Sequence, residues 1–180
     1  MARLIPVSCY QWTFRDRLFQ MKHLALSLSI SLLLATYAYA APVVFIVRHA
    51  EKASTGGKDP DLSVQGQNRA DALAHILKDS QITSVFVTEF KRTQETAAPT
   101  ARAAHVSPTM IPANDIGAVI EKLRALNGNA LVIGHGNTIP DLLKALGITT
   151  SITIPEDDYT EIFAVLVGDA PKLVRLHYPF

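Results

Sequence analysis

Residues 43–52 read VVFIVRHAEK, an apolar run that ends abruptly in charge. The part from Val43 to Val47 is typical of a strand that is buried on both faces of a sheet. Arg48 and His49 follow this strand directly. Open α/β sheets bind their ligands at the carboxyl ends of the strands. The stretch therefore predicts an α/β fold, and it raises the question whether the Arg-His pair binds an anion.

Apolar patterns along the rest of the chain alternate between strands and helices. Strands are predicted at 82–87, 108–111 and 130–133, and helices at 70–77, 93–104, 116–123 and 139–146. Two further apolar runs, 162–167 and 173–176, are predicted as late antiparallel edge strands. This order favours a three-layer α/β sandwich, in which a mainly parallel sheet has helices on both faces.

Residues 21–40 have the pattern of a secretory signal peptide. A short basic front at Lys22 and His23 precedes an apolar run from 24 to 34, and Ala-Tyr-Ala at 38–40 is a small-x-small cleavage site. The apolar run is short for a transmembrane span. We expect cleavage after Ala40, with an uncleaved N-terminal anchor as the alternative.

Two regions are therefore expected, an extension with its leader at 1–40 and one mature domain at 41–180. Translation could start at Met1 or at Met21, because a complete leader follows Met21. We predict a periplasmic or secreted protein with no stable membrane insertion after cleavage. The only cysteine, Cys9, leaves with the leader, so the mature domain has no disulfide and depends on its core. The formal net charge of +1 gives no argument for nucleic acid as a partner.

Three places in the domain put charge directly after a predicted strand. Arg48 and His49 follow the first strand, Arg92 follows 82–87, and His135 follows 130–133. Each residue alone would be an ordinary surface or loop residue. Parallel strands bring their carboxyl ends to one edge, so two arginines and two histidines are expected to converge there. Arginine binds phosphate with two donors, and histidine is a competent nucleophile near neutral pH.

Four motifs in these segments resemble the histidine phosphatase superfamily, the phosphoglycerate mutase-like group. VRHAEK at 47–52 resembles its RHG signature, and DLSVQGQNRADALA at 61–74 resembles its LSxxGxxRAxxLA helix. KRTQETA at 91–97 resembles its second-arginine motif, and VIGHGNT at 132–138 its second-histidine motif. The late segment DDYTEIFAV at 157–165 is similar to the C-terminal strand of small exported RHAEK-type members.

The resemblance implies a catalytic cycle through a phosphohistidine. His49 would attack phosphorus, Arg48 and Arg92 would hold the phosphate, and His135 would stabilise the group in transfer. Water would then release phosphate. The resemblance implies neither a metal nor any other cofactor, and the sequence has no clustered carboxylates or CxxC pattern.

Two further positions are candidates for substrate binding. Asn137 follows the second histidine, where phytase-like relatives carry an acid. Lys52 would add positive charge, and its alternative role is a solvated surface lysine. The third signature position holds Ala50 instead of glycine. We expect a right-handed backbone there, since a positive φ would cost alanine roughly 1 kcal/mol.

The proton donor is the main open point. A leaving alkoxide needs a proton, commonly from a carboxylic acid. The segment between Arg92 and His135 is too short for the acid-bearing insertion of true mutases. Asp115 and Glu51 are the candidates that remain. The alternative roles are an N-cap of the next helix for Asp115, and an ion pair with Lys52 or Lys58 for Glu51.

The sequence thus predicts a histidine acid phosphatase-type hydrolase of a phosphomonoester. Its partner would be a small-molecule or envelope-attached phosphate ester, such as an envelope sugar phosphate. A phosphohistidine phosphatase is one alternative, because imidazole leaves more easily than an alkoxide. A non-catalytic domain that binds a phosphate ligand is the other alternative.

Overall fold

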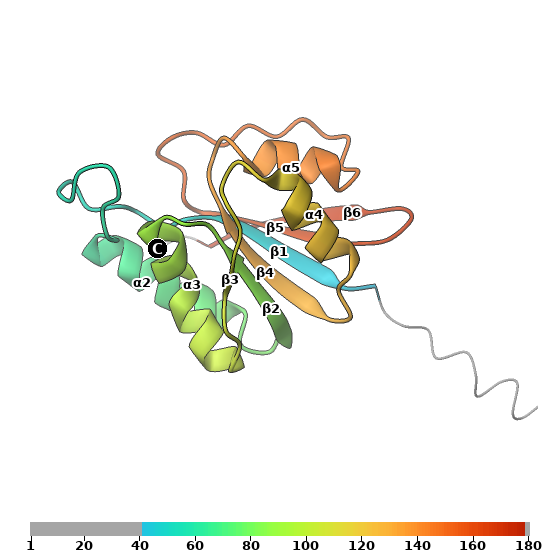
Figure 1. The fold of residues 1–180 in the computed structure, drawn as a ribbon, viewed down its shortest axis with the longest axis horizontal. Helices are drawn as coiled ribbons and strands as arrows, with labels where there is room; N and C mark the ends of the chain where they lie inside the picture. Colours follow the sequence, from blue (N-terminus) through green and yellow to red (C-terminus); the bar gives the residue numbers. More distant parts are fainter. Residues whose placement is uncertain (1–40, 179–180) are drawn as a thin grey trace, which may run out of the picture. The chain divides into compact units, whose positions relative to one another are not determined.

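The computed structural model describes residues 41–178. Within them, six strands and four helices follow one another in the predicted order (Figure 1). The strands are β1 (Val43–Arg48), β2 (Ile82–Val87), β3 (Thr109–Met110), β4 (Asn129–Gly134), β5 (Glu161–Leu166) and β6 (Lys172–His177). The helices are α2 (Val64–Ile76), α3 (Lys91–Ala104), α4 (Ile116–Arg124) and α5 (Ile139–Ala145).

The strands form one sheet in the order β3-β2-β4-β1-β5-β6. Strands β3, β2, β4 and β1 run parallel, whereas β5 lies antiparallel to β1 and β6 antiparallel to β5. The prediction of a mainly parallel sheet with late antiparallel strands is therefore confirmed. Only β6 of these two late strands is at an edge, because β5 lies between β1 and β6.

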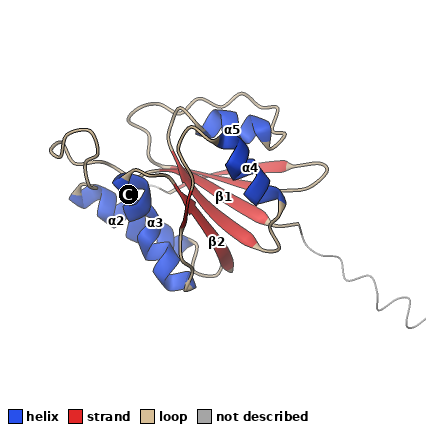
Figure 2. Cartoon of the chain, viewed as in Figure 1, coloured by secondary structure: helices blue, strands red, loops and turns tan. Residues whose placement is uncertain are grey.

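Helices cover both faces of the sheet and complete a three-layer sandwich (Figure 2). On one face, α4 and α5 pack over a core that includes Val44, Ile46 and Val132. On the other face, α2 and α3 pack over a core that includes Val47 and Ile133. Alternate side chains of β1 thus enter two different cores, which is why the whole strand is apolar.

Helix α2 comes very close to the segment that follows β1. Ser63 caps the helix and accepts a hydrogen bond from the N–H of Gly66 at 3.0 Å. A Cβ added at Gly66 would stand 2.2 Å from the carbonyl oxygen of Glu51. That oxygen also accepts the N–H of Ser63 at 2.9 Å. The glycine of the LSxxGxxR segment therefore allows α2 to pack against the backbone two residues beyond His49.

No helix within residues 41–178 is long and apolar enough to cross a membrane. The predicted leader and its cleavage site after Ala40 lie outside the described residues.

Candidate functional site

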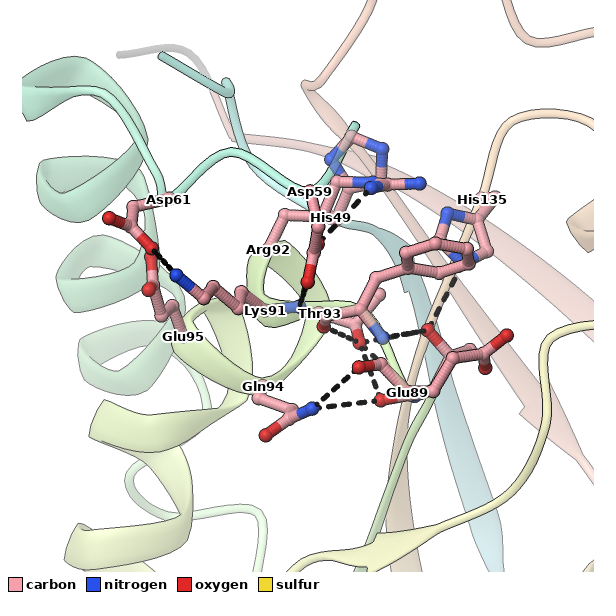
Figure 3. Close-up of polar contacts among 12 residues, drawn as sticks. His49, Asp59, Asp61, Glu89, Lys91, Arg92, Thr93, Gln94, Glu95 and His135 are labelled. Atoms are coloured by element: carbon pink, nitrogen blue, oxygen red, sulfur yellow. Dashed lines mark hydrogen bonds and ion pairs between the residues drawn. The ribbon is translucent and has the colours of Figure 1, made fainter. Parts of the chain in front are cut away.

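The ends of β1, β2 and β4 bring the predicted residues together at one edge of the sheet. The N–H of His49 donates to the carbonyl of Gly134 at 3.0 Å, which joins the end of β1 to the end of β4. The rings of His49 and His135 are 5.4 Å apart between centroids. Figure 3 shows Arg92 and both histidines close together. The predicted convergence at the carboxyl edge is therefore present in the structure.

His49 is buried and has one free ring nitrogen. Its Nδ1 lies 2.8 Å from the carbonyl oxygen of Ala50. A carbonyl can only accept, so Nδ1 carries the hydrogen and Nε2 keeps its lone pair. Burial lowers the pKa of His49 to about 4, and the positive charges of Arg92 and Arg48 act in the same direction. The imidazole is therefore neutral at neutral pH, with an unprotonated Nε2.

His135 is also buried and is oriented by a residue at the end of β2. Its Nε2 lies 3.2 Å from the hydroxyl oxygen of Thr88, which in turn lies 3.0 Å from the hydroxyl of Thr93. Hydroxyls donate or accept, so these contacts orient the ring without fixing its tautomer. Burial lowers the pKa of His135 to about 4; Arg92 lowers it further, whereas Glu89 opposes the shift.

Arg48 is held by the loop that precedes β5. Its Nη1 donates to the carbonyl oxygens of Pro155 and Asp158 at 2.8 and 3.1 Å. Its guanidinium lies over the ring of Tyr159, 4.3 Å from the centroid. The buried Nε has no hydrogen-bond partner within residues 41–178. This Nε–H is therefore a buried donor that no described residue satisfies.

Arg92 lies at the start of α3, where an aromatic ring and a carboxylate contact it. Its guanidinium lies over the ring of Phe90, 4.2 Å from the centroid. Its Nη1 is 3.7 Å from a carboxylate oxygen of Asp59, in the loop between β1 and α2. Each arginine thus rests on an aromatic ring beside a neutral histidine. The arrangement suits an anion with several oxygens, such as phosphate.

The two predicted acids have other contacts. Asp115 is exposed and caps α4, where it accepts the N–H of Ala118 at 2.9 Å, so the N-cap alternative is confirmed. Glu51 forms an ion pair, but with Arg69 at 2.7 Å and not with Lys52 or Lys58. Arg69 comes from α2, whose packing the sequence pattern alone does not place. The role of Asp115 as a proton donor stays a prediction.

The remaining predicted residues have simpler settings. Lys52 is exposed and forms an isolated backbone bridge with Leu62, and Asn137 is exposed beyond His135. Their roles in substrate binding stay predictions. Ala50 is not among the residues with a positive φ, so alanine costs nothing there, as expected. Within residues 41–178, no group of three or more His, Cys, Asp or Glu residues could hold a metal ion.

Sequence reasoning missed four residues that touch this site. Thr88, Phe90 and Tyr159 contact His135, Arg92 and Arg48 respectively, and Asp59 faces Arg92. Thr88 and Phe90 closely follow the end of β2, so their place in the chain could have indicated them. Asp59 and Tyr159 lie in loops, where no periodic pattern shows which way a side chain points.

The chain matches the family model of the histidine phosphatase superfamily (branch 1) over residues 44–113. No curated protein matches it significantly. One similar solved structure is the protein histidine phosphatase SixA complexed with tungstate. It has a TM-score of 0.63 and 24% identity, over 75% of this chain and 96% of that chain.

Two further structures have the same fold. A putative alpha-ribazole-5'-P phosphatase from Escherichia coli str. K-12 substr. MG1655 has a TM-score of 0.60 and 17% identity, over 77% of this chain and 97% of that chain. The putative phosphohistidine phosphatase SixA from Agrobacterium tumefaciens has a TM-score of 0.57 and 16% identity, over 76% of this chain and 98% of that chain. The family match covers residues 44–113, which contain Arg48, His49 and Arg92, and the described domain shares the fold of these solved structures.

Proposed function

We propose that this protein is a phosphatase of the histidine acid phosphatase type, which hydrolyses a phosphomonoester through a phosphohistidine on His49. The observation that carries the proposal is the state of His49. Its Nδ1 donates to Ala50, its Nε2 is unprotonated, and burial keeps the ring neutral. A neutral imidazole that faces an anion site is a ready nucleophile.

In the first step, Nε2 of His49 attacks phosphorus as the bond to the ester oxygen breaks. Arg48 and Arg92 hold the phosphoryl oxygens and offset the charge that develops on them. His135, 5.4 Å from His49 between ring centroids, contacts the group in transfer. In the second step, water attacks phosphorus, the P–N bond breaks, and its electron pair returns to Nε2.

A phosphohistidine substrate is the second candidate. It is favoured by the names of two structures with this fold, which are described as protein histidine phosphatase and putative phosphohistidine phosphatase. The first step would then move phosphate from one imidazole to another. Such a leaving group depends less on a proton donor than an alkoxide does.

We further propose that the enzyme acts after export, on a small or envelope-attached ester. This rests on the leader pattern at 21–40. The N-terminal sequence of the protein recovered from cells tests it. An N-terminus at Ala41 supports export, and one that retains 21–40 contradicts cleavage.

Phosphate release tests the catalytic proposal. Purified wild-type protein, His49→Ala and the exposed-surface control His75→Ala are assayed on p-nitrophenyl phosphate, sugar phosphates and phosphohistidine. We expect His49→Ala to lose turnover by at least about a thousandfold, since the covalent step cannot occur. His75→Ala should retain it. Quenching the wild type during turnover should trap an acid-labile phosphoenzyme.

Two outcomes would contradict the proposal. Full turnover by His49→Ala would exclude the phosphohistidine route. A wild-type protein that binds inorganic phosphate but turns over none of these substrates would instead be a phosphate-binding module.

A further inference from the structure

The proposed ester hydrolysis needs a group that moves protons, and the two site histidines have other roles in it. His49 is the nucleophile and His135 contacts the group in transfer, and in the ligand-free site burial lowers the pKa of both rings to about 4. A carboxyl group is the usual proton donor to a leaving alkoxide. The carrier should therefore be a carboxylate that borders the phosphate site.

Most carboxylates around the crevice already have other partners. Glu51 binds Arg69 through both its oxygens, and Asp115 caps α4. Asp158 accepts the N–H and the hydroxyl of Thr160 at 2.8 Å. These contacts engage the carboxylate oxygens of Glu51, Asp115 and Asp158. Glu89, which accepts the N–H of Ala113 at 2.9 Å, reaches toward the loop before α4.

Asp59 is placed differently, because it faces Arg92 itself. Its Oδ1 lies 3.7 Å from Nη1 of Arg92, which is longer than an N–H···O hydrogen bond of about 2.7–3.2 Å. The carboxylate therefore stands beside the guanidinium without using up its donors. The N–H of Lys91 donates to its two oxygens at 3.1 and 3.4 Å and fixes its position. The side chain is 38% exposed, so water reaches it.

The neighbouring charges distinguish Asp59 from Asp61 in the same loop. Asp61, two residues further on, binds the ammonium of Lys91 at 3.0 Å on the exposed surface. Arg92 is the charged group in ion-pair contact with Asp59 among the described residues. Figure 3 shows Asp59 between Arg92 and the first turn of α3, with Asp61 further out beside Lys91. One loop thus carries two aspartates, and only the first borders the anion site.

We propose that Asp59 is the proton carrier of the reaction, which rests on the phosphatase function proposed above. As His49 forms its bond to phosphorus, the P–O bond to the leaving group breaks. The released oxygen takes the proton of the Asp59 carboxyl group and departs as an alcohol. In the second step, the Asp59 carboxylate accepts a proton from the attacking water. Asp59 passes this proton to the departing phosphate, which leaves as a monoanion, and the Asp59 carboxylate and the neutral His49 ring are restored.

The proton can enter with the substrate. Phosphate monoesters lose their second proton near pH 6, so part of the substrate is a monoanion under mildly acidic conditions. A monoanion that binds Arg92 carries its acidic proton next to the Asp59 carboxylate. Transfer between the two oxygens gives the dianion and the protonated carboxyl group, and no other reagent is needed.

Leaving-group dependence tests the proposal. Asp59→Asn is compared with Asp61→Asn, which removes the same charge from the same loop. The substrates are p-nitrophenyl phosphate, phenyl phosphate and an alkyl phosphate, in order of increasingly basic leaving groups. We expect Asp59→Asn to lose about a hundredfold or more in kcat/KM on the alkyl ester, and less than about tenfold on p-nitrophenyl phosphate. Asp61→Asn should match the wild type on all three.

The outcomes separate a proton carrier from a structural residue. Equal losses by Asp59→Asn on all three esters would mean that Asp59 acts only through Arg92, and would overturn the proposal. Retained binding of inorganic phosphate by calorimetry shows that the variant is folded, and Asp59→Glu should recover part of the alkyl-ester activity. A wild-type protein inert on every ester would instead contradict the phosphatase function itself.

Discussion

Thr96 ties the segment after β1 to helix α3. Its hydroxyl accepts the N–H of Ala50 at 2.9 Å and donates to the carbonyl of Arg92 at 2.6 Å. It therefore links the residue after the nucleophile to the backbone of the second arginine. Thr100 lies one turn later in the same helix, and its buried hydroxyl has no partner within residues 41–178.

Replacing each threonine by valine gives a matched pair. Thr96→Val should cost about 1–3 kcal/mol in the free energy of unfolding, because the buried N–H of Ala50 loses its acceptor. Thr100→Val should be neutral or slightly stabilising, since it removes a buried polar atom that makes no bond. Urea unfolding of both variants measures the difference. Equal costs would show that the Ala50 contact contributes nothing.

At this scale, the sequence predicted the charged residues near the ends of strands, and it missed Thr88 and Phe90 after β2 and the loop residues Asp59 and Tyr159. Arg48, His49 and His135 were predictable because parallel strands bring their ends together. Asp59 was not predictable, because its contact with Arg92 depends on the path of a loop. The ion pair of Glu51 was expected with a lysine close in sequence, but the actual partner, Arg69, comes from a helix that packs nearby.

At the scale of elements, the contact of α2 with the end of β1 depends on Gly66. Gly66→Ala would place a methyl group 2.2 Å from the carbonyl of Glu51, which a hydrogen bond from Ser63 holds in place. Helix and loop must move apart, so we expect a loss of about 3 kcal/mol or more in the free energy of unfolding. Turnover should fall too, because this loop carries His49.

Gly117 provides the control for this change. It lies in α4, and the nearest atom to an added Cβ is an Asp115 oxygen at 3.6 Å. Gly117→Ala should therefore stabilise the protein by up to about 1 kcal/mol, since alanine favours the helix. Thermal and urea unfolding measure the change in the free energy of unfolding for both variants. A mild effect at Gly66 would contradict the tight approach of α2.

The types and order of the elements followed from periodicity, but some boundaries did not. The first helix was predicted from Ala70, where its apolar spacing begins, whereas α2 starts at Val64. Its first turn is largely polar and exposed, so no apolar face signals it. The Ser63 cap is a local contact and the close approach at Gly66 is a tertiary one, and apolar periodicity reports neither.

At the scale of the whole molecule, the two buried histidines make stability depend on pH. Their pKa values are about 4 in the folded protein and near 6.5 in the unfolded chain. Between these values the unfolded state binds more protons, so stability is complete above pH 6.5 and falls as the pH drops toward 4. The loss should reach about 3 kcal/mol for each histidine.

Urea midpoints at pH 7, 5.5 and 4 measure this dependence. The double variant His49→Gln, His135→Gln should lose much of the slope, because glutamine does not titrate. Inorganic phosphate should reduce the loss in the wild type, since a bound anion favours the charged imidazoles. A wild-type midpoint that stays constant from pH 7 to 4 would contradict the neutral state of the two rings.

The position of β1 in the sheet also has a consequence for how the chain is made. It is the first strand of residues 41–178 to leave the ribosome, yet its neighbours are β4 and β5. The contact of Val43 with Asn129 joins residues 86 apart. Such distant pairing is slow to form. The central strand therefore waits, unpaired, until most of the chain has been synthesised. A nascent chain that stops before Glu161 would leave one apolar edge of β1 open, and such edges promote aggregation.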